Sequence, residues 1–198
     1  MPTHSEGGSA CSVAAAEIVV VDTSPVRNFV QAGAQRAFAG YLGSRVRITV
    51  DVSRELEEAA GSLPRLRTFL REWPPNDPVD LPPDLKQKAA DILGFIGDDD
   101  PQASLQDLGE VTSVILAEHL RASGECERPI LLLDDVRHGK NLAKPRRLEV
   151  IDTPALIAEM VCADAMSREL GNKVWRATFS DRSKWPAFDE RLRQACGK

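Results

Sequence analysis

Short apolar runs that end in acidic residues constrain the fold of this chain more than any other feature. Residues 18–21 form a β-branched run followed by Asp22, and residues 130–133 form a second apolar run followed by Asp134 and Asp135. Short apolar runs bounded by turn-forming residues are typical of strands buried on both faces, as in a parallel sheet. We therefore expect a parallel sheet with carboxylates at the ends of its strands.

Helical patterns alternate with these strands. Residues 45–50 and 148–151 are predicted as two further strands, and Ser24 and Asp51 as the caps of the first two helices. The first of these helices is expected to continue to Ala34. Further helices are expected over residues 63–73, 85–96, 107–121 and 153–161, and a helical segment between Asp135 and Lys144. Such alternation predicts right-handed crossovers and a three-layer α/β/α sandwich with a parallel sheet of four or five strands.

The 198 residues fit one domain with additions. Residues 1–16 are small and polar and are predicted to form a flexible N-terminal tail, followed by the α/β domain over residues 17–163. Within it, residues 63–104 are expected to form a proline-rich helical insertion. Residues 164–198 are a C-terminal extension, aromatic-rich and basic after Gly171, that we expect to pack on the body or on a second subunit.

Composition and charge narrow the classes of function. No apolar run approaches the roughly 20 residues of a membrane span, so no membrane association is expected. The net charge of −5 means that contact with a nucleic acid requires a local basic patch or a bound cation. The cysteines lie far apart without zinc-site spacing, which predicts four reduced thiols in a cytoplasmic protein. They are Cys11, Cys126, Cys162 and Cys196.

The acidic residues should meet at one edge, because functional groups of a parallel sheet gather beyond the carboxyl ends of its strands. Asp22, Asp134 and Asp135 follow strands, while Glu55 and Glu110 lie in the first turns of helices that start near the same edge. Crowded carboxylates repel one another unless a cation neutralises them, and oxygen ligands select Mg²⁺ or Mn²⁺. Such a site activates water and stabilises charge on phosphorus.

Each acid also has a purely structural interpretation. Asp22 could bond the next turn, Glu55 could be a solvated charge, and Glu110 could complete a capping box with Asp107. Of Asp134 and Asp135, one could cap the following helix.

Four segments in this order resemble the PIN-domain ribonucleases, in particular the bacterial PIN toxins of toxin–antitoxin pairs. The segments are Val20-Val21-Asp22-Thr23-Ser24, Val50-Asp51-Val52-Ser53-Arg54-Glu55-Leu56, Leu108-Gly109-Glu110 and Leu132-Leu133-Asp134-Asp135. The resemblance spans residues 18–161. It implies a PIN-like parallel sandwich that hydrolyses RNA phosphodiester bonds with Mg²⁺ or Mn²⁺.

Residue by residue, the resemblance implies metal ligands at Asp22, Glu110 and either Asp134 or Asp135. Glu55 would be a further acid of the catalytic set, and Thr23 or Ser24 would support the site by hydrogen bonding. A small antitoxin partner and a homo-oligomer are also implied.

The basic residues just downstream of the acids are predicted to contact RNA, foremost Arg137 and Lys140. Others in that surface are His138, Lys144, Arg146 and Arg147. A solvated helix face is the alternative interpretation.

Three other functions compete with a ribonuclease. A catalytically silent PIN-like binding or assembly module would retain the acids without turnover. A receiver-type signalling domain would need an acidic pair after the first strand and a lysine after a late strand, which this chain lacks. Rossmann and P-loop enzymes are excluded because their glycine motifs are absent.

Overall fold

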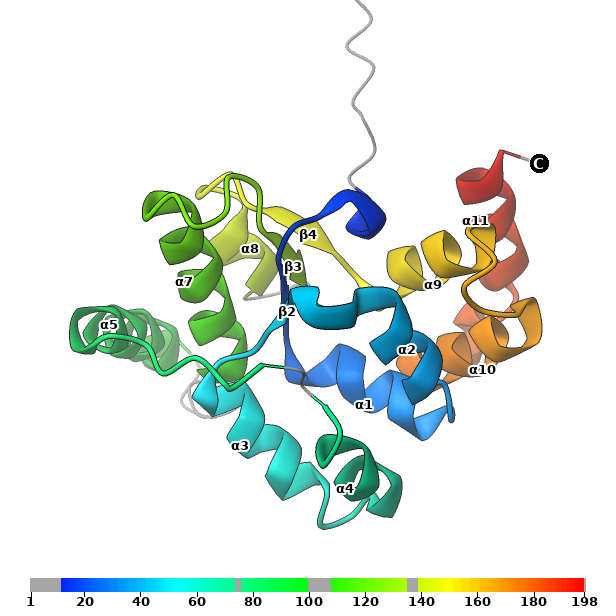
Figure 1. Cartoon of the computed structure of the whole chain (residues 1–198), viewed down its shortest axis with the longest axis horizontal. Coiled ribbons are helices and arrows are strands. Elements are labelled where there is room, and N and C mark those ends of the chain that lie inside the picture. The colour runs from blue at the N-terminus through cyan, green and yellow to red at the C-terminus, as the bar shows by residue number, and fades with distance from the viewer. Residues whose placement is uncertain (1–11, 74–75, 100–107, 135–138, 198) are drawn as a thin grey trace, which may run out of the picture.

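The computed structural model describes residues 12–73, 76–99, 108–134 and 139–197, with residues 95–99 described by their backbone alone. A four-stranded parallel sheet, in the order β2-β1-β3-β4, forms the centre of the molecule (Figure 1). Its strands are β1 (Val19–Val21), β2 (Val46–Arg47), β3 (Ile130–Leu132) and β4 (Glu149–Ile151). The predicted α/β class with a parallel sheet is thus confirmed. A strand forms in each of the four predicted places, but the second covers only Val46–Arg47 of the predicted residues 45–50, because α3 begins at Val50.

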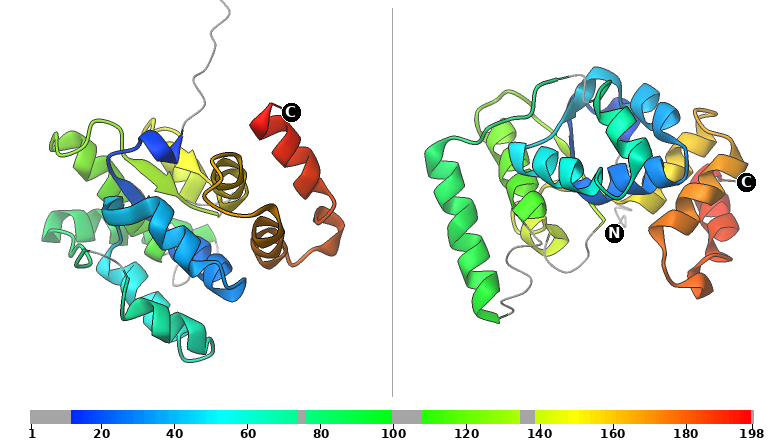
Figure 2. Two further views of the ribbon diagram at one scale, coloured as in Figure 1. Left: turned by 45° about the vertical axis from the view of Figure 1, so that its right-hand side comes forward. Right: turned by 90° about the horizontal axis from the view of Figure 1, so that it is seen from below.

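Helices cover both faces of the sheet because its central strands are apolar on both sides. In β1, Val19 and Val21 belong to one buried cluster and Val20 to the other. The first cluster includes residues of α1 (Thr23–Gln31), α2 (Gln35–Leu42), α3 (Val50–Ala59), α4 (Pro64–Leu70) and α9 (Thr153–Cys162). The second includes residues of α5 (Pro83–Asp99), α7 (Leu108–Ala122) and α8 (Gly139–Ala143). The views of Figure 2 show this layered arrangement.

Helix α7 is buried around most of its circumference, as its sequence predicts. It packs on strands β1 and β3, while α3, α5 and α8 also contact it. Its start lies beside α3, which brings the first turn of α7 to the carboxyl edge of the sheet.

Residues 76–82 of the proline-rich insertion, called here the connector, are fixed to the sheet edge. The Val79 amide donates to the carbonyl of Ile48 at 2.8 Å, and the Val79 carbonyl accepts from the Val50 amide at 3.1 Å. The connector thus continues the pairing just beyond β2. Residues 100–104 of the predicted insertion lie outside the described residues.

Helix starts differ from the prediction in their capping residues. Asp22, not Ser24, caps α1, because its carboxylate accepts from the Ser24 amide. Thr49, not Asp51, caps α3 through a bond from the Val52 amide at 3.2 Å. The first helix also ends at Gln31 rather than at the predicted Ala34, because Gly33 adopts a φ of +77°, and α2, which was not predicted, begins at Gln35.

The chain is packed from Ser12 onward, so residues 12–16 do not belong to a flexible tail. The Glu159 carboxylate accepts from the Ser12 hydroxyl and from the amides of Val13 and Ala14. Arg45 donates to three carbonyls of the same segment. Residues 1–11 lie outside the described residues.

The C-terminal extension packs on the body of the same chain. It contains α10 (Arg168–Thr178), η3 (Arg182–Lys184) and α11 (Ala187–Cys196). Trp175 of α10 and Phe188 of α11 join the buried cluster that holds α1 and α9. Figures 1 and 2 place these two helices at the end of the molecule opposite α5.

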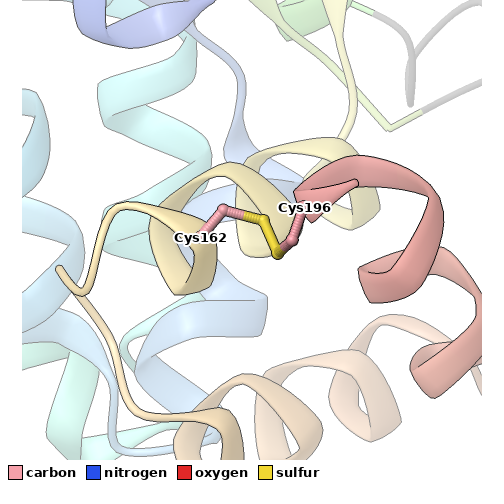
Figure 3. Close-up of a disulfide and its surroundings, with 2 residues drawn as sticks. All are labelled: Cys162 and Cys196. Carbon is pink, nitrogen blue, oxygen red and sulfur yellow. A yellow bond between two sulfur atoms is a disulfide. The ribbon is translucent and has the colours of Figure 1, made fainter. Parts of the chain in front are cut away.

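A disulfide between Cys162 and Cys196 ties α11 to α9 (Figure 3). The prediction of four reduced thiols is wrong for this pair, because packing of α11 on α9 brings the two Cα atoms to 5.4 Å across 34 residues of sequence. Cys126 is a buried free thiol, and Cys11 lies outside the described residues. Within the described ranges, no helix combines the length and apolarity needed to cross a membrane.

Candidate active site

The order of the strands places the topological switch point of the sheet between the ends of β1 and β3. The chain leaves β1 through α1 to reach β2 on one side, and leaves β3 through α8 to reach β4 on the other. Helices α1 and α8 pack on opposite faces of the sheet. Parallel α/β sheets bind ligands at such a point, outside the carboxyl ends of the strands. Asp22 and Asp134 lie there, and the Asp22 amide donates to the Leu132 carbonyl at 3.1 Å.

Asp22 is the most deeply buried acid of this edge. Its residue is 3% exposed, and its carboxylate accepts a long bond of 3.4 Å from the Ser24 amide. Burial raises the pKa of Asp22 to about 7, and the charges of Glu55 and Asp134 add to the rise, while the amides of Thr23 and Ser24 act in the opposite direction. The surroundings of Asp22 therefore disfavour the ionised form of its carboxyl group at neutral pH.

Glu55 joins the starts of three helices. From α3, its carboxylate accepts from the Thr23 hydroxyl at 2.5 Å, at the start of α1, and from the Gly109 amide at 2.9 Å, at the start of α7. A Cβ atom at Gly109 would lie 2.7 Å from a Glu55 oxygen, so any larger residue here would displace the Glu55 carboxylate. Burial raises the pKa of Glu55, and the two donors oppose the rise.

Asp134 is held at the start of α9. Its carboxylate accepts from the Thr153 amide at 2.7 Å, from the Thr153 hydroxyl at 2.8 Å and from the Asn28 side-chain amide at 2.9 Å. Burial raises its pKa, and the Thr153 donors oppose the rise. Asp135, the alternative ligand at this step, lies outside the described residues.

A cleft of about 550 Å³ opens over these acids. It is lined by Asp22, Thr23, Ser24, Arg27, Glu55, Glu58, Ala59 and Glu110. The structure therefore brings Asp22, Glu55 and Glu110 to one surface, together with the predicted supporting residues Thr23 and Ser24. Asp134 is not in the lining and acts on the cleft through its charge beside Asp22.

The residues present suit a hydrated divalent ion better than a closed cage. Among the described residues, no three His, Cys, Asp or Glu side chains are grouped closely enough to hold a metal ion together. Mg²⁺, however, is usually bound by one or two carboxylates, several waters and the phosphates of a substrate. Asp22 and Glu110 contribute two carboxylates to the lining of one cleft, while the charges of Glu55 and Asp134 act on Asp22. A carboxylate oxygen that accepts one hydrogen bond also retains a second acceptor direction.

The predicted basic surface downstream of the acids is divided between the two edges of the sheet. Lys140 of α8 forms an ion pair with Asp152 at 2.9 Å, at the carboxyl edge. Arg146 pairs with Glu118 near the end of α7, just before the chain enters β4 at the opposite edge. Arg146 and its neighbour Arg147 therefore lie at the edge opposite the acids, and their contact with RNA stays a prediction. Arg137 lies outside the described residues.

Sequence reasoning missed several residues of this edge. Arg27 and Glu58 line the cleft, while Asn28 and Thr153 hold Asp134. Thr153 did carry a signal, since Asp-Thr follows both β1 and β4 and each threonine bonds an acid from another segment. Asn28 carried none, because nothing local indicates a contact with a residue 106 positions away.

Comparison with protein-family models, with curated proteins and with solved structures finds no match to this chain. The resemblance to PIN-domain ribonucleases therefore rests on its four sequence segments.

Proposed function

We propose that this protein is a divalent-metal-dependent ribonuclease that hydrolyses RNA phosphodiester bonds at the carboxyl edge of the sheet. The observation that carries the proposal is the placement of Asp22, almost fully buried at the switch point between β1 and β3, where the charges of Glu55 and Asp134 act on it. A buried carboxylate among other carboxylates is costly without a compensating cation.

Asp22 and Glu110 would hold the ion, with Asp134 or Asp135 as a further ligand. Bound Mg²⁺ or Mn²⁺ would polarise the scissile phosphate and lower the pKa of a coordinated water. Glu55, oriented by Thr23 and Gly109, would accept the proton of the attacking water at its carboxylate. Arg27 on the cleft wall would offer a charged donor to the phosphate.

The toxin assignment is the finer part of the proposal, and it rests on the resemblance to PIN toxins. It carries with it a small antitoxin protein as partner and a homo-oligomer. The cytoplasmic location was predicted from reduced thiols, and the Cys162–Cys196 disulfide argues against it.

A catalytically silent PIN-like module is the second candidate, and one observation favours it. Both oxygens of Glu55 and both oxygens of Asp134 already accept hydrogen bonds at helix starts. The hydrogen bonds of these two acids thus give each of them a structural role that requires no metal.

Cleavage of a panel of single-stranded RNAs separates the two candidates. The wild type should cleave with Mg²⁺ or Mn²⁺ and stop with EDTA. Asp22→Asn should lose at least about 10³-fold in rate, because metal-held charge stabilisation is worth several kcal/mol. Asp152→Asn, which changes the equivalent cap of α9, should retain activity. Full activity of Asp22→Asn would reject the site, and no cleavage by the wild type with either ion would favour the silent module.

A further inference from the structure

The C-terminal extension carries a positive charge that the rest of the chain lacks. Residues 167–197 contain seven Lys or Arg and four Asp or Glu, although the whole chain has a net charge of −5. Three of these cations pair with acids of the same extension, namely Arg168 with Asp189, Lys173 with Glu169 and Arg193 with Glu190. The remaining cations gather mainly at the turn between α10 and α11.

At this turn, cations lie over aromatic rings. The guanidinium carbons of Arg176 and Arg182 are 5.1 and 5.4 Å from the centre of the Trp185 ring. The ammonium of Lys184 is 5.3 Å from the centre of the Phe179 ring. We call residues 176–185 the basic turn. Its three cations are exposed and form no ion pair with any described residue, although Asp181 within the same turn feels the charge of Lys184. Its two rings are half-buried.

Hydrogen bonds fix the basic turn in place. The Trp185 indole N–H donates to the Phe179 carbonyl at 3.1 Å, and the Trp175 indole N–H donates to the Lys184 carbonyl at 3.0 Å. Trp175 and Phe188, which flank the turn in sequence and space, are buried in the cluster that holds α1 and α9. A surface that is already ordered loses little conformational entropy when it binds a partner.

The basic turn continues onto the outer face of α10. A shallow cleft of about 420 Å³ there is lined by Arg168, Glu169, Asn172, Lys173 and Arg176. Helix α10 packs directly on α1, the helix that Asp22 caps (Figure 2). The basic surface and the acidic cleft are therefore attached to the same helix.

We propose that the basic turn and the adjoining face of α10 bind the phosphate backbone of single-stranded RNA. The inference deepens the proposed ribonuclease function and rests on it. An acidic cleft repels RNA, so the phosphates need cations elsewhere on the body, and the predicted basic surface beside the acids is divided. Exposed cations held beside aromatic rings are the combination that single-stranded nucleic acids recognise.

RNA binding in the absence of cleavage tests this surface. Asp22→Asn protein in EDTA would be titrated into a fluorescent single-stranded RNA over a range of salt concentrations, with and without Arg176→Gln and Arg182→Gln. If each arginine contacts one phosphate, the slope of log K against log salt should become shallower by about 1.4. Relative to the affinity at 1 M salt, this change amounts to a loss of about 25-fold at 0.1 M salt.

Two control proteins make the result specific. Lys86→Gln with Arg128→Gln removes two exposed charges from other parts of the molecule and should leave the slope unchanged. Arg176→Lys with Arg182→Lys keeps both charges and should restore the slope, which a purely structural role in stacking on Trp185 would not do.

An unchanged slope in the Arg→Gln protein would overturn the surface, as would equally strong competition by polyglutamate. Failure of the surface and failure of the ribonuclease are distinguishable. Wild-type cleavage with an unchanged slope rejects only the surface, whereas altered binding without metal-dependent cleavage rejects only the ribonuclease.

Discussion

Helices α1 and α9 begin with nearly the same residues but in different electrostatic settings. Asp22-Thr23-Ser24-Pro25 opens α1 and Asp152-Thr153-Pro154 opens α9, and each aspartate caps its own helix. Each threonine hydroxyl donates to an acid from another segment, Thr23 to Glu55 and Thr153 to Asp134. Asp152, however, pairs with Lys140 at 2.9 Å, whereas Asp22 has no ion pair with a described residue and is 3% exposed.

The difference separates the structural role of such an aspartate from its chemical role. A helix cap needs only an oxygen directed at the first amides, and asparagine or aspartate supplies it equally well. The Lys140 ammonium already compensates the charge at Asp152. The charge at Asp22 has no such compensation among the described residues, which is the property expected of a carboxylate that receives an external cation.

The largest expected effect is a change in the pH dependence of stability when Asp22 is replaced by asparagine. Because the folded-state pKa of Asp22 is about 7, above the ordinary 3.8, the native state holds the proton more tightly and the free energy of unfolding falls as pH rises from about 4 to 7. Asp22→Asn removes this loss. In EDTA it should be more stable than the wild type by up to about 4 kcal/mol at pH 8 and by only about 1 kcal/mol at pH 4.5.

Urea unfolding at the two pH values measures this difference. Asp152→Asn serves as the control and should have the opposite sign at pH 8, with a loss of about 1 kcal/mol, because it removes the partner of Lys140. Equal stability of Asp22→Asn and the wild type at both pH values would show that burial does not destabilise the ionised Asp22 carboxylate.

A smaller effect on stability is expected when Asp152 loses its ion-pair partner and, like Asp22, has no cation beside it. Lys140→Met keeps an apolar stem but removes the cation from a pair whose side chains are 28% and 30% exposed. We expect a loss of about 1–2 kcal/mol in the free energy of unfolding at pH 7.5, between the values for exposed and buried pairs.

The double variant with Asp152→Asn completes a thermodynamic cycle. Its loss should be smaller than the sum of the two single losses, because the second substitution removes an acid that has already lost its partner. Strictly additive losses would indicate that Lys140 does not stabilise Asp152, and the contrast with Asp22 would then disappear.

The strands, and the placement of Asp22 and Asp134 at the same edge of the sheet, could be predicted because the signal for each strand lies within a few consecutive residues. Continuous apolar runs indicated β1 and β3, and parallel pairing places the residues after these two strands side by side. Burial of α7 was equally visible in its apolar circumference.

The remaining features depend on contacts between distant segments. The bond from the Gly109 amide to Glu55 spans 54 positions, and the disulfide links residues 34 positions apart without any spacing signal. The structure has Asp22 and Thr49 as helix caps where Ser24 and Asp51 were predicted. Several consecutive residues could cap each helix, and the point at which the preceding strand ends selects one of them.

The most direct test of the account is a calorimetric titration of Mn²⁺ into the wild type, Asp22→Asn and Asp152→Asn at pH 8. The account predicts saturable binding by the wild type and by Asp152→Asn, and no binding by Asp22→Asn. Binding by Asp22→Asn equal to that of the wild type, or no binding by the wild type, would contradict the claim that Asp22 is the centre of a divalent-metal site.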